Sequence, residues 1–253
     1  MFSRKVPILE RERKRVLWER SAGRGQSFAI AMSGWSSVSP IQQLVTKAFT
    51  RALVNDSKLP QTIRNIKGMS GQIYRSFINN LVESHENARY LEIGSWAGST
   101  ATAALYGNTA KCVCIDNWSQ FGGPKTAFFA NIELVRSDKI DFSFIEQDFR
   151  TVDYGTLGTF NIYMFDGPHT ELDQYDGIMI AQPALEKSHI MIVDDWNWQS
   201  VRDGTLRALV DTKCRIEFWF EVRTTFDNSH ALVGGEDSDW HNGYFIAMVE
   251  KQR

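Results

Sequence analysis

Apolar residues between positions 89 and 249 fall into seven short runs, separated by polar and glycine-containing segments. The runs cover residues 89–93, 111–115, 143–146, 160–165, 189–193, 215–222 and 244–249, and each is predicted to be a β-strand. The first five are short and mostly apolar, as buried parallel strands are. Because helical segments alternate with these strands, the pattern predicts an α/β fold with a doubly wound, mostly parallel sheet of seven strands.

Two amphipathic helices are predicted before the first strand, over residues 41–54 and 71–86. In the first of them Ile41, Val45 and Phe49 recur at helical spacing. A flexible link lies between the two helices at residues 67–71, where it is interpreted either as part of a lid or as a plain connector.

The first 40 residues differ from the rest, because basic and acidic residues are mixed there. The run 8–20 is predicted to be a charged helix. It is interpreted as a solvated terminus rather than as an arm that binds a polyanion or a partner subunit, since such charge runs are usually solvated. The predicted organisation is an N-terminal arm and helical extension over residues 1–68 and a catalytic domain over residues 69–253.

Composition narrows the class of protein. With 253 residues, 43% of them hydrophobic and 23% charged, the chain is predicted to be a globular protein with a sizeable core. The net charge of −2 gives no argument for nucleic acid, and no apolar run approaches the roughly 20 residues of a membrane span. The cysteines Cys112, Cys114 and Cys214 lack zinc-site spacing, and their low, odd number fits a reducing cytoplasm. A cytoplasmic protein without nucleic-acid or membrane partners is therefore expected.

A glycine turn joins the first predicted strand to a helix that starts at Ser99. The turn has the pattern Glu92-x-Gly94-x-x-x-Gly98. Glycine tolerates a positive φ and leaves room for a ligand, and a helix N-terminus favours an anionic group. The dinucleotide pattern Gly-x-Gly-x-x-Gly would need a glycine at Trp96. The turn predicts a nucleotide-like cofactor, although an ordinary strand-to-helix turn would look the same.

Acidic residues follow the second and third strands at the edge where such sheets bind ligands. Asp116 lies about 20 residues past the glycine turn, where an acid can accept hydrogen bonds from ribose hydroxyls. Asn117 and Trp118 follow it, and an aromatic ring there is expected along the adenine face. Asp148 follows the third strand on the same edge, with Phe149 next to it. Each acid alone also fits a turn or a surface loop.

Three more carboxylates follow the fourth and fifth strands. Asp166, Asp194 and Asp195 should converge, because these strands are expected to be neighbours. Carboxylates this close repel unless a cation lies between them, so a divalent cation such as Mg²⁺ or Ca²⁺ is predicted; the alternative is a helix cap and a solvated acid. His169, on the loop above the site, is predicted to take a proton from a substrate hydroxyl.

These segments resemble known enzymes. The glycine turn resembles the first motif of class I S-adenosylmethionine-dependent methyltransferases, which is acidic-x-Gly-x-x-x-Gly. Asp166-Gly167-Pro168-His169, together with Asp194-Asp195, resembles the metal-dependent O-methyltransferases related to the macrolide-sugar enzymes. Those relatives have Asp-Gly-Ser-His at the end of the fourth strand, and Glu-Asp or Asp-Asp after the fifth. This sequence departs from them at Pro168 and, relative to the closest, at Asp194.

The resemblance implies a Rossmann-like sheet, S-adenosylmethionine as cofactor, and Mg²⁺ or another divalent cation. It implies cofactor contacts at Glu92, Gly94, Ser95, Trp96, Gly98, Ser99, Asp116, Asn117, Trp118, Asp148, Phe149 and Asp166. It also implies that Asp166, Asp194 and Asp195 are metal ligands, and that His169, Asp166 and Asp195 carry the chemistry.

The predicted function is O-methylation of a hydroxyl group on a small molecule or sugar. One alternative is a nicotinamide-dependent oxidoreductase on a Rossmann-like fold, which Trp96 disfavours. Another is a non-catalytic cofactor-binding homologue. The sequence does not give the methyl acceptor, and it leaves open whether the chain forms a homo-oligomer.

Overall fold

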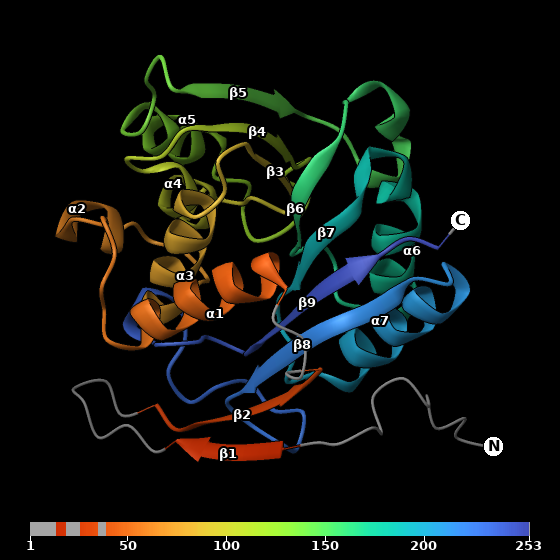
Figure 1. The fold of residues 1–253 in the computed structure, drawn as a ribbon. Helices are drawn as coiled ribbons and strands as arrows, with labels where there is room; N and C mark the ends of the chain where they lie inside the picture. Colours follow the sequence, from red (N-terminus) through yellow and green to blue (C-terminus); the bar gives the residue numbers. More distant parts are fainter. Residues whose placement is uncertain (1–13, 19–25, 35–38, 253) are drawn as a thin grey trace.

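The structure is a computed structural model that describes residues 14–18, with the backbone alone, 26–34 and 39–252 (Figure 1). In this part of the chain nine strands form one sheet, in the order β1-β2-β8-β9-β7-β6-β3-β4-β5. Their bounds are β1 Lys14–Trp18, β2 Phe28–Ser33, β3 Ala88–Ile93, β4 Ala110–Ile115, β5 Ile140–Ile145, β6 Phe160–Phe165, β7 Leu185–Val193, β8 Arg215–Arg223 and β9 Tyr244–Glu250.

The strands predicted after residue 88 are all present, and they form the mostly parallel part of the sheet. Strands β3 to β7 run parallel to one another. Strand β9 inserts between β7 and β8 and runs antiparallel to both, so β8 has the direction of the first five. The mixed α/β fold is therefore confirmed, including a final hairpin-like pair of strands.

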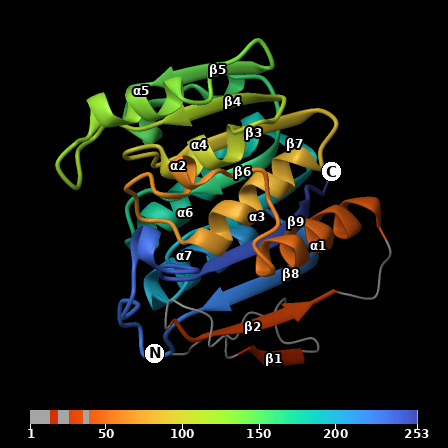
Figure 2. The ribbon, with the colours of Figure 1, turned by 90° about the vertical axis from the view of Figure 1, so that its left-hand side faces the viewer.

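Helices cover both faces of the sheet (Figures 1 and 2). One face carries α1 Pro40–Leu53, α2 Gln61–Arg64, α3 Gln72–Glu83, α4 Ser99–Leu105 and α5 Lys125–Glu133, and the other carries α6 Glu171–Ala181 and α7 Gln199–Asp211. Short 3₁₀ turns lie at η1 Phe149–Thr151, η2 Tyr154–Thr156, η3 Gln182–Ala184 and η4 Gly235–Asp237. None of the helices in the described ranges is long and apolar enough to cross a membrane.

Helix α3 forms a large part of the hydrophobic core on the first face of the sheet. It packs between α1 and α4 above the sheet, and almost all of its residues are buried. Its Tyr74 ring stacks on Tyr244 of β9, with the ring centroids 3.6 Å apart. The parallel strands β3, β4, β6 and β7 are buried on both faces, which explains their nearly continuous apolar runs, whereas the edge strand β5 alternates half-buried and exposed residues.

The N-terminal part of the chain departs from the prediction. Residues 14–18, within the predicted charged helix 8–20, form β1 instead, and the rest of that run lies outside the described residues. Strand β1 pairs with β2, which pairs antiparallel with β8 at the edge of the sheet. The physical reason is that β8 offers a row of edge N–H and C=O groups, a partner that a local charge pattern does not reveal.

The sheet accordingly has nine strands in the described residues rather than seven. In the described residues of the predicted N-terminal extension, α1 and α2 are helices and β1 and β2 are strands. The predicted domain boundary after residue 68 stays a prediction.

Candidate functional site

A cavity of about 240 Å³ lies at the carboxyl ends of the parallel strands. Ten of the predicted site residues line it: Gly94, Trp96, Asp116, Asn117, Asp148, Phe149, Asp166, His169, Asp194 and Asp195. Five others do not: Glu92, Ser95, Gly98, Ser99 and Trp118. The parallel topology thus brings residues from five separate stretches of sequence into one site, as the rule for doubly wound sheets predicts.

The glycines of the turn are required by the packing of the protein itself. Gly94 has φ +85°, and a β-carbon there would lie 1.9 Å from the backbone carbonyl oxygen of Asp166. Gly98 has φ +77°, and a β-carbon there would lie 2.9 Å from the ring of Phe128. The glycine pattern alone therefore says little about a cofactor.

Asp116 connects the glycine turn to the end of β4. Its Oδ2 accepts a hydrogen bond from the backbone N–H of Trp96, and its Oδ1 accepts one from the N–H of Trp118, both at 2.7 Å. Each carboxylate oxygen still has a second lone pair. Asp116 therefore shapes the turn and, because it lines the cavity, can also accept a hydroxyl donor.

Trp118 does not take the place expected along an adenine ring. It stacks on Phe144, with centroids 4.7 Å apart, and its indole N–H donates to the carbonyl oxygen of Trp96 at 3.2 Å. Aromatic rings that do line the cavity include Trp96, Phe121 and Phe149. Phe149 is buried and meets a neighbouring ring of β6 edge to face, so it forms a rigid wall.

Glu92 is buried beneath the turn. Its Oε2 accepts a hydrogen bond of 2.5 Å from the hydroxyl of Tyr90, and burial raises the pKa of Glu92 to about 7. Ser99, at the start of α4, forms a hydroxyl–hydroxyl hydrogen bond of 3.1 Å with Ser70. That contact ties the turn to the link at residues 67–71, from which Met69 reaches the cavity.

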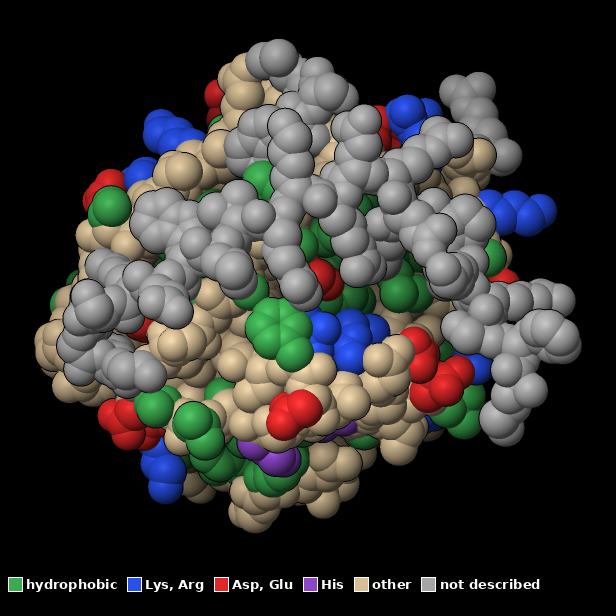
Figure 3. Space-filling view, turned by 90° about the horizontal axis from the view of Figure 1, so that it is seen from below, with side chains coloured by type: hydrophobic (Ala, Val, Ile, Leu, Met, Phe, Trp, Pro, Cys, Tyr) green, Lys and Arg blue, Asp and Glu red, His purple; other side chains and the backbone are tan. Residues whose placement is uncertain are grey.

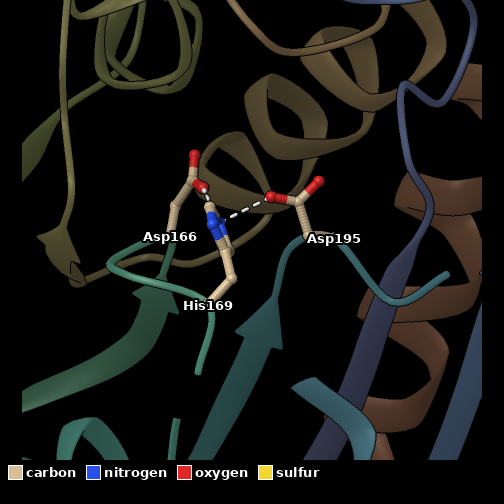
Figure 4. A group of neighbouring side chains, drawn as sticks. All are labelled: Asp166, His169 and Asp195. Carbon is tan, nitrogen blue, oxygen red and sulfur yellow. Dashed lines mark ion pairs between the residues drawn. The ribbon is translucent and has the colours of Figure 1, made fainter. Parts of the chain in front are cut away.

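Asp166, His169 and Asp195 converge on one point (Figure 4). Asp166 follows β6 and Asp195 follows β7. The Nε2 atom of His169 lies 2.6 Å from Oδ2 of Asp195 and 4.0 Å from Oδ1 of Asp166. One nitrogen or oxygen atom from each of the three residues lies within 4.8 Å of the others.

The electrostatics of this cluster favour a positive charge between the carboxylates. Burial lowers the pKa of His169, but Asp166 and Asp195 outweigh burial and raise that pKa to about 10. Burial raises the pKa of Asp195, but the imidazole outweighs it, so this carboxyl stays ionised. His169 therefore holds a proton here, and it becomes a base only when another charge neutralises the two carboxylates.

Asp194 is placed differently from the other two aspartates. It is 2% exposed, and its Oδ1 accepts the backbone N–H of Asp195 at 2.7 Å. Burial and the neighbouring carboxylates raise the pKa of Asp194 well above its ordinary value, and burial raises that of Asp166 to about 6. Among the described residues, the group whose donor atoms lie together is thus Asp166, His169 and Asp195, and the role of Asp194 as a metal ligand stays a prediction.

Residues from the connection between β8 and β9 complete the cavity, and the sequence reasoning missed them. His230, His241 and Asn242 come from residues 224–243. A hairpin connection is usually 2–5 residues long, so the length of this segment was the available signal. On the face shown in Figure 3, histidine side chains lie next to hydrophobic ones at the surface.

Trp198 lies between two histidines. Its ring meets that of His169 edge to face at 4.8 Å and that of His230 at 4.9 Å. It therefore separates the buried cluster from the exposed His230 and forms one wall of the cavity.

Backbone strain is concentrated around the cavity. Eight non-glycine residues in the described ranges have positive φ, and four of them line it: Trp96, Phe121, Asp195 and His241. Such conformations cost of order 1–3 kcal/mol each, and they cluster at functional sites. The cavity is therefore the best candidate for the active site.

No protein-family model matches the chain, and no curated protein matches it. Among solved structures, it is similar to TrmN from Thermus thermophilus, with 12% identity over 71% of this chain and a TM-score of 0.48. That match spans 48% of TrmN, so this chain covers about half its length. An O-methyltransferase from Bacillus cereus in complex with SAH matches at 13% identity, covering 85% of this chain and 93% of that one, with a TM-score of 0.46. An rRNA methylase from Streptococcus thermophilus matches at 10% identity, covering 72% and 96%, with a TM-score of 0.45. Similarity at this level carries no information on what this chain binds or does.

Proposed function

We propose that the protein is an S-adenosylmethionine-dependent O-methyltransferase that acts on a hydroxyl group with the help of a divalent cation. The observation that carries the proposal is the shared cavity. The glycine turn and Asp116 contribute the part of its lining that we call the cofactor end, and the cluster of Asp166, His169 and Asp195 contributes the part that we call the chemical end. A nucleotide-like cofactor and a reacting hydroxyl would then meet between the two ends.

At the cofactor end, the residues offer acceptors and flat walls. Asp116 has lone pairs for ribose hydroxyls, while Asp148, whose Oδ1 accepts the backbone N–H of Arg150 at 2.9 Å, has a second oxygen for an amino group. Trp96 and Phe149 supply apolar surface for the base. S-Adenosylmethionine, when bound, supplies an electrophilic methyl group on a positively charged sulfur.

At the chemical end, the donor set fits a divalent cation. The two carboxylates of Asp166 and Asp195 are ligands that Mg²⁺ and Mn²⁺ both accept, and the imidazole of His169 beside them has the role of the base. Nε2 of His169 lies 2.6 Å from Oδ2 of Asp195 and 4.0 Å from Oδ1 of Asp166, so the two carboxylates already meet around one positive charge. A cation there supplies a Lewis acid that lowers the pKa of a hydroxyl.

The residues have separate roles in this proposal. Asp166 and Asp195 hold the cation, and Asp194 remains a neutral neighbour. His169, beside both carboxylates, takes the proton of the acceptor hydroxyl when their charge is neutralised. Trp198 and Phe121 form the apolar wall for the acceptor, which suits a small molecule or a sugar.

The test combines binding and turnover. Calorimetric titration with S-adenosylhomocysteine and with NAD separates a methyltransferase from a nicotinamide enzyme. Methyl transfer is then assayed with small phenols, sugars and RNA as acceptors, with a divalent cation and with excess chelator.

We expect Asp166→Asn to abolish transfer and to keep S-adenosylhomocysteine binding. Asp211→Asn is the matched control. Asp211 is an exposed acid on α7, and its carboxylate accepts a hydrogen bond of 3.0 Å from the hydroxyl of Tyr175. Full activity of Asp166→Asn, or in chelator, would rule out the cation-assisted mechanism.

A further inference from the structure

Asn242 connects the segment at residues 224–243 to the acidic cluster. It is 3% exposed, and its side-chain Nδ2 donates a hydrogen bond of 2.7 Å to Oδ1 of Asp195. Its Oδ1 accepts the backbone N–H of Ala231 at 2.9 Å, while its carbonyl oxygen accepts the N–H of Asn197. Figure 4 shows the blue C-terminal part of the chain running beside Asp195.

These contacts fix the orientation of the amide. The N–H of Ala231 can only donate, so it faces the amide oxygen, and the carboxylate of Asp195 can only accept, so it faces the amide nitrogen. Asparagine satisfies both at once. An apolar side chain of similar size satisfies neither.

The same contacts divide the two oxygens of Asp195. Oδ1 is held by Asn242, and Oδ2 is left facing His169 at 2.6 Å. The backbone of Asp195 has φ +53°, a costly conformation for a residue other than glycine. Such a conformation persists only where surrounding contacts hold the residue in place. We propose that Asn242 is a positioning residue that turns Oδ2 of Asp195 toward a divalent cation held by Asp195 together with Asp166. This inference rests on the proposed function.

The experiment measures the affinity of the full chain for Mn²⁺ by electron paramagnetic resonance, in the wild type and in Asn242→Leu. Loss of a residue that orients a metal ligand typically weakens metal affinity by about 10–100-fold, which is the expected result. S-Adenosylhomocysteine affinity, measured in parallel, should stay close to that of the wild type. The melting temperature should fall, because the N–H of Ala231 and the carboxylate of Asp195 each lose a partner, and the melting curve shows whether the variant is folded. In turnover, the Mn²⁺ concentration for half-activation should rise while the KM for S-adenosylmethionine does not.

The matched control is Thr225→Val. It removes the hydrogen bond of 2.7 Å from the hydroxyl of Thr225 to the carbonyl oxygen of Ser229, in the same segment but away from Asp195. Its Mn²⁺ affinity should equal that of the wild type. If Asn242→Leu fails to give a cooperative melting curve, the smaller Asn242→Ala replaces it.

The outcomes separate the two proposals. If the wild type binds no Mn²⁺ at millimolar concentration, the cation-assisted function fails, and the positioning role fails with it. If the wild type binds Mn²⁺ and a folded Asn242 variant binds within twofold of it, the positioning role alone is wrong. An equal loss in Thr225→Val would also overturn it, because the effect would then come from the segment as a whole.

Discussion

The backbone of Gly94 lies against the carbonyl group of Asp166, and the two residues join the cofactor end of the cavity to its chemical end. The N–H of Asp166 donates to Ile93 at 2.8 Å, so β3 and β6 are held together up to their last residues. No β-carbon fits at position 94, where it would lie 1.9 Å from the Asp166 carbonyl oxygen.

Gly94→Ala should therefore destabilise the protein and displace Asp166. We expect a loss of more than about 2 kcal/mol in the free energy of unfolding, because the positive φ costs about 1–2 kcal/mol and the steric clash adds to it. Gly122→Ala is the control, since Gly122 has φ +80° but no atom within 4 Å of the added carbon. Urea unfolding of both variants checks this. Equal losses would mean that the close approach does not matter.

Asp116→Asn should weaken both the turn and cofactor binding. An amide has one acceptor oxygen, so the N–H of Trp96 or that of Trp118 loses its partner, at a cost of about 1–3 kcal/mol. We expect affinity for S-adenosylhomocysteine to fall about tenfold or more by calorimetry. Asp153→Asn, an exposed acid that accepts the N–H of Gly155 at 3.1 Å, changes the same kind of turn outside the cavity and should bind normally.

His189 should make the protein sensitive to acid. It is 1% exposed in β7, and burial lowers its pKa to about 3. The unfolded chain binds a proton near pH 6.5 that the folded chain refuses, so stability is complete above pH 6.5 and falls as pH decreases toward 3. At pH 5 the loss amounts to about 2 kcal/mol. His189→Gln should reduce the difference in unfolding free energy between pH 8 and pH 5 by this amount; an unchanged difference would contradict the assignment.

Glu92 should act in the opposite direction. Because burial raises its pKa to about 7, the folded chain binds a proton that the unfolded chain has released above about pH 4.5. This contribution is present below pH 4.5 and is lost as pH rises through 7, with a difference between pH 5 and pH 8 of about 2–3 kcal/mol. We expect Glu92→Gln to gain stability relative to the wild type as pH rises over this range. If the unfolding free energies of the wild type and of Glu92→Gln change with pH in parallel, the raised pKa of Glu92 is wrong.

The sheet was predictable because its signal is local. The inner parallel strands β3, β4, β6 and β7 are buried on both faces and contain short apolar runs, and Asp116, Asp166 and the pair Asp194-Asp195 follow such runs directly. The topology then places them on one edge without further information. That is why ten of the predicted residues line one cavity.

Other features depend on partners that lie far away in sequence. The pairing of β2 with β8 joins residues near position 30 to residues near position 222. Trp118 has two neighbours of similar apolar character, the cavity and Phe144, and only packing decides between them. Asp194 and Asp195 are adjacent and chemically identical, and both are buried. Oδ2 of Asp195 faces His169 in the cluster, whereas Oδ1 of Asp194 accepts the backbone N–H of Asp195.

The hydrogen bonds of the Gln26 side chain limit when one wall of the cavity can form during folding. Its side chain accepts the N–H groups of Asp239 and Trp240 and donates to the carbonyl oxygens of Val233 and His241, across more than 200 residues of sequence. On the ribosome these partners emerge more than 200 residues after Gln26, so the four hydrogen bonds cannot form until then. The wall formed by the segment before β9 therefore depends on a contact of long sequence separation, which forms slowly.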